Sequence, residues 1–126
     1  MCLDNITKTN LPQGTVTAYK VFKTRGKKRV LFGVHQEGFS YKRRKWLIDK
    51  NTKSINSTTR YGYSSFYQTG FHCFTSAPDA LKYAESDEVI HRVLLKEITA
   101  IGEQGIYSCI CARQMFIMEE ITNENL

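Results

Sequence analysis

The sequence contains no long apolar run, which excludes a membrane-spanning helix of the usual length. No stretch of its 126 residues approaches the roughly 18 consecutive apolar residues that a span requires. The opening residues, MCLDNITKTN, also lack the basic region followed by an apolar segment that marks a secretory signal. We therefore expect a cytoplasmic protein that does not act at a membrane.

Cysteines are few, and their spacing excludes the common zinc and redox motifs. The four are Cys2, Cys73, Cys109 and Cys111, and no two of them have the Cys-x-x-Cys spacing. Cys109 and Cys111 are two residues apart, so in a strand their side chains would share one face, where cysteine commonly acts as a small buried hydrophobic residue. We expect a structural role for these thiols, no metal site and no bound cofactor.

Acidic residues are scarce in the first half of the chain. Residues 1–63 contain three, against fourteen Lys or Arg, whereas residues 64–126 contain nine acids against four Lys or Arg, and the net charge is +6. Clustered cations concentrate phosphate groups and release counterions on binding. The asymmetry favours an anionic partner: a nucleotide, a nucleic acid or an acidic protein. The alternative, that these charges only solvate exposed strands and hairpin tips, stays open.

One basic run is interleaved with aromatic residues. Arg43 and Arg44 lie between Tyr41 and Trp46, within the run Lys42–Lys45. Neighbouring cations and aromatic rings can hold phosphates while they stack on bases, so Arg43, Arg44 and Trp46 are candidate ligand-binding residues. Cations are also common on exposed strand edges, where they discourage edge-to-edge pairing.

The composition, 41% hydrophobic and 12% aromatic, is that of one ordinary globular domain. We expect a loose N-terminal arm at 1–14, the domain at 15–121 and a tail at 122–126. Residues 16–23 alternate between two faces and predict a strand, which a basic tip at 25–29 would join to a second strand as a hairpin.

The most informative segment is Gly70–Ala84. It opens with a short aromatic strand, and Ser76, followed by Ala-Pro-Asp, has the features of a helix start. Small and apolar residues then recur at helical spacing and predict a short helix that ends near 85–87. Capping alone explains Ser76, but Thr75 and Ser76 could also contact a phosphate, because a helix N-terminus exposes unpaired N–H groups.

Most of the remaining chain predicts strands. Residues 88–98 predict one strand and residues 107–121 one or two closing strands; both segments are rich in apolar and β-branched residues and flank a Gly-containing turn. Residues 51–68 are polar without a clear apolar period and predict a long loop or flap. Several strands, one helix and no strand–helix alternation predict an α+β fold, with a mixed or mainly antiparallel sheet and one or two short helices in a single domain.

His72 is the main histidine candidate. It alternates with Cys73 in the aromatic strand and could face a pocket as a catalytic group, although a strand histidine is more often a hydrogen-bonded structural residue. His35 could contact phosphate, and His91 is expected to be structural or exposed. No Ser-His-Asp or Cys-His arrangement can be assembled from the sequence, so we expect a binding protein in preference to an enzyme.

Parts of the chain resemble small proteins of bacteriophages and of Bacteroidetes genomes. The matching pieces are Met1-Cys2-Leu3, Ala18-Tyr19-Lys20-Val21, Gly70-Phe71-His72-Cys73-Phe74 followed by Asp79-Ala80, and residues 112–120. The resemblance implies a viral or mobile-element origin, and hence the cytoplasm of a host cell. It implies no particular activity.

The segment Gly70–Ala84 is also similar to an element of ADP-ribosyltransferase-fold proteins, in which a strand that ends in hydroxyl residues runs into a helix beside NAD. The similarity implies that Thr75 and Ser76 lie beside the ligand and that the strand carrying Tyr19 and Lys20 supplies the other wall. It implies that Glu119 or Glu120 takes the place of the late catalytic acid. Where that family has His or Arg in the first strand, this sequence has Tyr19 and Lys20.

Three functions are consistent with these observations. The first is a phage-type accessory protein, for example one directed against host defence, that binds an anionic nucleotide-like ligand or nucleic acid through Tyr19, Lys20, Arg43, Arg44, Trp46, His72, Thr75 and Ser76. The second is an ADP-ribosyltransferase-like enzyme that uses NAD. The third is a protein inhibitor whose basic surface binds an acidic host factor, such as a nucleic-acid enzyme.

Overall fold

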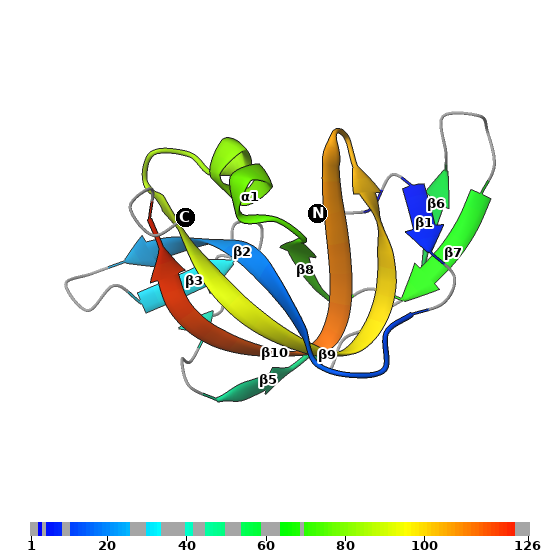
Figure 1. Ribbon diagram of the computed structural model, residues 1–126, viewed down its shortest axis with the longest axis horizontal. Helices are drawn as coiled ribbons and strands as arrows, with labels where there is room; N and C mark the ends of the chain where they lie inside the picture. Colours follow the sequence, from blue (N-terminus) through cyan, green and yellow to red (C-terminus); the bar gives the residue numbers. More distant parts are fainter. Residues whose placement is uncertain are drawn as a thin grey trace.

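The computed structural model describes residues 3, 5–8, 11–25, 30–33, 40–41, 45–49, 54–58, 64–68 and 70–122 (Figure 1). The predicted contacts of His35, Arg43 and Arg44, the basic tip at 26–29 and most of the predicted tail lie outside these residues. The described elements are β1 (Asn5–Lys8), β2 (Val16–Arg25), β3 (Val30–Gly33), β4 (Ser40–Tyr41), β5 (Trp46–Ile48), β6 (Ser54–Thr58), β7 (Ser64–Gln68), β8 (Phe71–Phe74), α1 (Ala77–Tyr83), β9 (Glu88–Gln104) and β10 (Tyr107–Ile121).

The described strands form an eight-stranded sheet and a separate β6–β7 hairpin. Every strand pairing among the described residues is antiparallel. The α+β prediction is therefore confirmed in its coarser form: the chain is a single domain of mostly antiparallel sheet with one short helix. Its helical share is so small that the fold is closer to mainly β.

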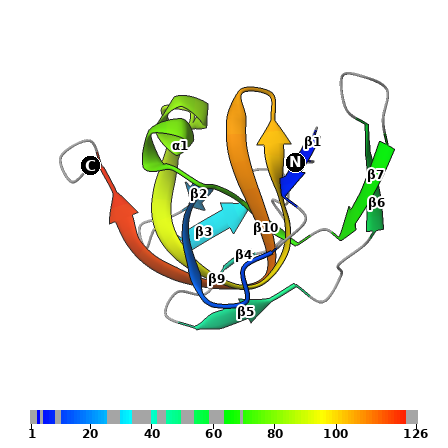
Figure 2. The same cartoon turned by 45° about the vertical axis from the view of Figure 1, so that its right-hand side comes forward.

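The main sheet is organised by β9 and β10, which form a long hairpin around Gly105. β2 pairs with the first half of β9, β8 pairs with β10, and β2 meets β8 at Tyr19 and Phe74. The pairings β9–β10–β8–β2–β9 thus close a circuit. Both views show the β9–β10 hairpin strongly bent, with α1 lying inside the bend and β5 on the opposite side (Figures 1 and 2).

Two predictions about the polar segments are wrong. Residues 5–8 of the predicted loose arm form β1, which pairs with β9, and Leu3 is buried. The predicted flap at 51–68 contains the paired strands β6 and β7. Short polar strands carry too few apolar residues to show a period-2 pattern, and their backbone hydrogen bonds to neighbouring strands decide the structure instead.

The alternation predicted for residues 16–23 is confirmed, and it sorts side chains between two hydrophobic clusters. Ala18 and Phe22 pack with residues of β3, β8, β9 and β10 in one cluster. Tyr19 and Val21 face the other, which includes Ala80 of α1. Because both faces of β2 are covered, this strand positions residues on either side of the sheet.

The strand-to-helix junction forms as predicted, with a shorter helix. Ser76 has extended backbone geometry and its Oγ accepts a hydrogen bond from the Asp79 N–H at 3.3 Å, which caps α1. The helix ends at Tyr83, because Ala84 is already extended. The rings of Phe74, Tyr83 and Tyr107 pack with centroids 5.0–5.9 Å apart and fix α1 against β8 and β10.

A candidate ligand-binding cavity

An open cavity of about 590 Å³ lies at the junction between β8 and α1. This volume is within the range of about 300–1,000 Å³ that is usual for small-molecule sites. Its lining comes from β2, the β8–α1 turn, the first turn of α1, β9 and β10. The lining residues are Tyr19, Thr75, Ser76, Ala77, Pro78, Arg92, Glu119 and Ile121.

The closed circuit of strands explains why these distant residues meet. Tyr19 is in register with Arg92 of β9 on one side and with Phe74 at the end of β8 on the other. The chain leaves β8 through Thr75 and Ser76, so both hydroxyls follow directly after Tyr19's partner. Residues in register on neighbouring strands point to the same face, which brings Tyr19 and Arg92 side by side.

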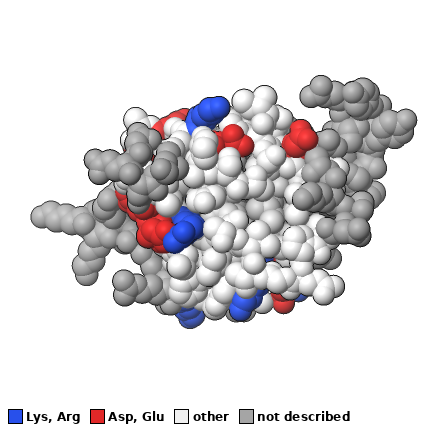
Figure 3. Space-filling model, in the orientation of Figure 1, with Lys and Arg blue, Asp and Glu red and all other residues white. Residues whose placement is uncertain are grey.

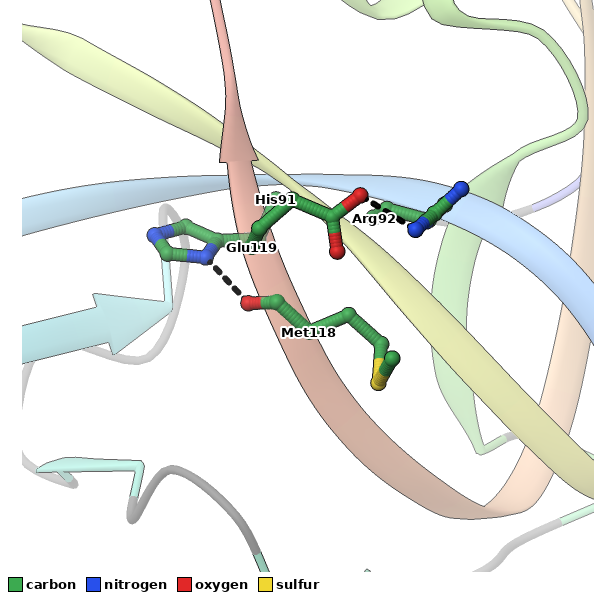
Figure 4. A network of polar contacts seen from close by, with 4 residues as sticks. All are labelled: His91, Arg92, Met118 and Glu119. Atoms are coloured by element: carbon green, nitrogen blue, oxygen red, sulfur yellow. Dashed lines mark hydrogen bonds and ion pairs between the residues drawn. The ribbon is translucent and has the colours of Figure 1, made fainter.

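Arg92 forms an ion pair with Glu119 of β10 (Figure 4). Their side chains are 43% and 46% exposed, so water screens the pair and a ligand can compete for either partner. The register of β9 and β10 is irregular between Ile117 and Glu120. At this irregularity β10 has one residue more than the facing stretch of β9. The extra residue changes the alternation of side chains along β10, so that Glu119 faces Arg92.

His91 holds this irregular stretch from the other side of β9. Its Nδ1 lies 2.9 Å from the Met118 carbonyl oxygen, and its ring meets Phe22 edge to face at 5.7 Å (Figure 4). The residue is only 3% exposed. The structural alternative predicted for His91 is therefore confirmed, and its alternation with Arg92 directs the arginine to the cavity.

Both hydroxyls at the junction contact the protein as well as the cavity. The Thr75 N–H and Oγ1 both donate to the Ser108 carbonyl oxygen, at 3.1 and 3.3 Å. Ser76 Oγ accepts from Asp79. Thr75 thus keeps lone pairs for a donor, and the Ser76 hydroxyl keeps its proton for an acceptor.

Lys20 and His72, predicted as binding residues, are not among the residues that line this cavity. The Lys20 ammonium instead donates to the His72 carbonyl oxygen at 2.8 Å and ties β2 to β8. Burial and the nearby Lys20 charge lower the pKa of His72 to about 4, and its Nδ1 lies 3.3 Å from the Gly70 carbonyl oxygen. The His72 ring is therefore neutral near pH 7. The residue belongs to β8, which lies between β10 and β2 in the sheet.

Glu119 and Glu120, the two candidates for the catalytic acid near the end of the chain, have different surroundings in the structure. Glu119 lines the cavity, whereas Glu120 is in register with His91, the residue that points away from it. Consecutive residues of a strand face opposite sides, so a single cavity can use only one of them.

Trp46 lies elsewhere, on β5. Its ring packs against Phe116 at 5.6 Å, and the Lys96 ammonium lies 4.1 Å from the ring centroid. On the face shown in Figure 3, the described Lys and Arg side chains lie in small groups, several of them beside Asp or Glu, and most of the described surface is uncharged. The predicted basic runs fall largely outside the described residues.

Arg92 is the cavity residue that sequence reasoning missed. An arginine in an alternating strand is typical of a solvated position, and nothing local distinguishes it. No local signal could have found it, because the packing of Ile90 in the cluster with Ala80 of α1 and of His91 against Phe22 is known only from the structure.

The thiols behave as the spacing predicts. Cys73, Cys109 and Cys111 are buried, and burial raises the pKa of Cys73 to about 11. Within the described ranges, no group of three or more His, Cys, Asp or Glu residues is placed to hold a metal ion. In the same part of the chain, no helix has the length and apolarity of a membrane span.

Comparisons of the chain with protein-family models, with curated proteins and with solved structures find no match.

Proposed function

We propose that the protein binds a nucleotide-like anion in the cavity between Tyr19, Arg92 and the β8–α1 turn. The observation that carries this proposal is the register of Tyr19 with Arg92 beside two hydroxyl residues. A nucleotide offers a flat base, a polyhydroxylated sugar and a phosphate. An aromatic ring, hydroxyl groups and a guanidinium match these three parts.

The ion pair gives the cavity a way to accept such a ligand. A phosphate can displace Glu119 from Arg92, because planar guanidinium binds phosphate in a bidentate manner and the pair is about half exposed. The released carboxylate then accepts hydrogen bonds from ribose hydroxyls or base N–H groups. Arg92 and Glu119 thereby contact two different parts of the ligand: the arginine binds the phosphate, and the glutamate binds the sugar or the base.

The chemistry of the lining supports binding more than catalysis. Among the described lining residues there is one carboxylate and no imidazole, thiol or amine. In a phage-type accessory role, binding alone suffices, because a protein that sequesters a host signalling nucleotide lowers its concentration without consuming it.

Calorimetric titration with AMP, ADP-ribose, NAD and a cyclic dinucleotide tests the proposal. At least one should bind, and Arg92→Gln should weaken it by about tenfold or more, because a charge-assisted contact is lost. Arg113→Gln is the matched control, since Arg113 is also a strand arginine, 46% exposed and 3.8 Å from its partner Glu97. Absence of binding by all four, or equal effects of the two variants, would refute the proposal.

A second candidate is an ADP-ribosyltransferase-like enzyme. It is favoured by one observation: Tyr19, Thr75, Ser76 and Glu119, which the family resemblance implies as site residues, line the same cavity. Incubation with labelled NAD and host lysate would show transfer of ADP-ribose to a target protein. Transfer that persists in Glu119→Ala would remove Glu119 from the mechanism.

A further inference from the structure

The cavity opens onto a sheet face that continues across four strands. Thr17 of β2 is in register with Leu94 of β9, Leu94 with Phe116 of β10, and Phe116 with Trp46 of β5. Residues in register share a face, so these four side chains form one transverse row. Thr17 is exposed, and the other three are half-buried.

This row lies on the same face as the cavity. Tyr19 and Arg92 are two residues along β2 and β9 from Thr17 and Leu94, and the side-chain period of a strand is two. The residues between them, Ala18 and Val93, are fully buried in the core below. By register, Tyr19 and Arg92 of the cavity and the row that ends at Trp46 therefore lie on the same side of the curved sheet.

A further row lies next to this one, on the side away from Tyr19 and Arg92. Lys96 is in register with Gln114, and Gln114 with Ile48, whose side chain is 54% exposed. Lys96 lies four positions after Arg92 on β9, which places the two residues about 13 Å apart along the strand. That span exceeds one nucleotide and suits a short oligonucleotide.

The chemistry of this face is a track of rings flanked by cations. Tyr19, Phe116 and Trp46 supply aromatic surface, and the Lys96 ammonium is held 4.1 Å from the Trp46 ring. Lys45, directly before β5, is exposed. Cationic side chains are visible along the lower margin of Figure 3, where Figure 1 draws β5. Glu97, the residue after Lys96, forms an ion pair with Arg113.

We propose that this face binds single-stranded nucleic acid, with one nucleotide in the cavity and a second base stacked at Trp46. Proteins that hold single strands combine aromatic platforms with cations that follow the backbone, and the net charge of +6 adds to the attraction. A duplex keeps its bases stacked inside and offers no base faces to these rings. The inference rests on the proposed function at its cavity end.

The sequence contains a single tryptophan, so fluorescence reports on Trp46 alone. Titration with a twelve-residue oligoadenylate, as DNA and as RNA, should quench this fluorescence, with an affinity that falls as salt is raised. AMP should bind without comparable quenching, and a duplex of the same length should bind more weakly. The DNA and RNA arms show which sugar the face accepts.

Variants separate stacking from charge. Lys96→Gln should weaken oligonucleotide binding about threefold to tenfold and reduce its salt dependence by the equivalent of about one phosphate contact. Lys82→Gln removes the same charge from an exposed lysine of α1 that neither lines the cavity nor belongs to the row of rings, and it should change neither. Trp46→Ala, followed by anisotropy of a labelled oligonucleotide, should weaken binding about tenfold, and Trp46→Phe much less.

The outcomes distinguish this inference from the function on which it rests. In one outcome AMP binds in a manner that depends on Arg92, but the oligonucleotide does not quench Trp46 and Lys96→Gln has no effect. This outcome refutes the nucleic-acid surface and leaves the cavity function in place. Quenching that depends on Lys96, without binding of AMP, ADP-ribose, NAD or the cyclic dinucleotide, supports the surface and removes the cavity function. If neither nucleotide binding nor quenching is observed, both proposals are refuted. Thermal unfolding of each variant shows that the fold is retained.

Discussion

Gly70 packs directly against the backbone of Ala112: a Cβ built on Gly70 would lie 2.2 Å from the Ala112 carbonyl oxygen. We expect Gly70→Ala to lower the free energy of unfolding by at least about 1–3 kcal/mol, because backbone atoms cannot move aside as a flexible side chain can. Urea denaturation measures the loss. Gly14→Ala is the control, since nothing lies within 4 Å of the Cβ at that position, and equal effects of the two substitutions would contradict the packing argument.

Ser76 should contribute to stability independently of any ligand. Ser76→Ala removes the acceptor for the Asp79 N–H, and loss of an N-cap costs about 1 kcal/mol. Ser76→Asp should retain most of the stability, because aspartate is also a good cap. Ser86→Ala changes an exposed serine outside the helix and should have little effect on the melting temperature. A Ser76→Ala protein as stable as the wild type would show that the cap is not needed.

Glu119→Gln separates binding from catalysis by the sign of its effect. If the cavity holds an anion at Arg92, Glu119→Gln should strengthen AMP binding about twofold to tenfold, because the ion pair no longer has to be broken and the amide oxygen still accepts the hydrogen bonds of the ligand. If the cavity transfers ADP-ribose, the same variant should lose activity. Glu97→Gln, which removes the partner of Arg113, is the matched control for both assays.

His72 should make stability depend on pH. Burial and Lys20 lower the pKa of His72 from its ordinary value of 6.5 to about 4. Between these values the unfolded chain binds more protons than the folded chain, so stability is full above about pH 6.5 and declines as the pH falls toward 4. The difference in unfolding free energy between wild type and His72→Gln should shrink by up to about 3 kcal/mol over this range. His91 is present in both proteins and cancels. A pH-independent difference would mean that His72 titrates normally in the folded state.

Cys73 should resist alkylation until the protein unfolds. Burial raises its pKa to about 11, although the Lys20 charge acts in the opposite direction. At pH 8 the reactive thiolate is therefore scarce as well as shielded. Mass spectrometry after iodoacetamide treatment should find the Cys73 peptide unmodified in the native protein and modified in urea. Rapid modification of the native protein would contradict the burial of this strand.

The sequence predicts the parts of the fold that short-range patterns determine. The alternation of residues 16–23, the shared face of Cys109 and Cys111 and the cap at Ser76 are all recognisable within a few residues, and the structure bears them out. β1 and the β6–β7 hairpin escape prediction, since their strands are polar and depend on partners that the local sequence does not reveal.

The candidate site shows the same division. Thr75 and Ser76 can be identified from the strand-to-helix junction alone. That Tyr19 and Glu119 join them, whereas Lys20 and Glu120 do not, depends on which face of β2 and β10 turns outward. Arg92 enters only through a pairing of strands more than seventy residues apart, together with the irregular register near Glu119, and neither leaves a pattern in the sequence.

The closed circuit of strands also sets the order in which the chain can fold during synthesis. β2 leaves the ribosome early but pairs with β9, and β1 pairs with Ile101–Glu103, so both must wait until most of the chain has been made. The cation-rich half is translated first, and its strands β1 and β2 stay without their partner β9 for that interval. The nascent chain therefore passes through a stage at which its basic half is available to ribosomal RNA before the main sheet is complete, and synthesis of the acidic second half ends that stage.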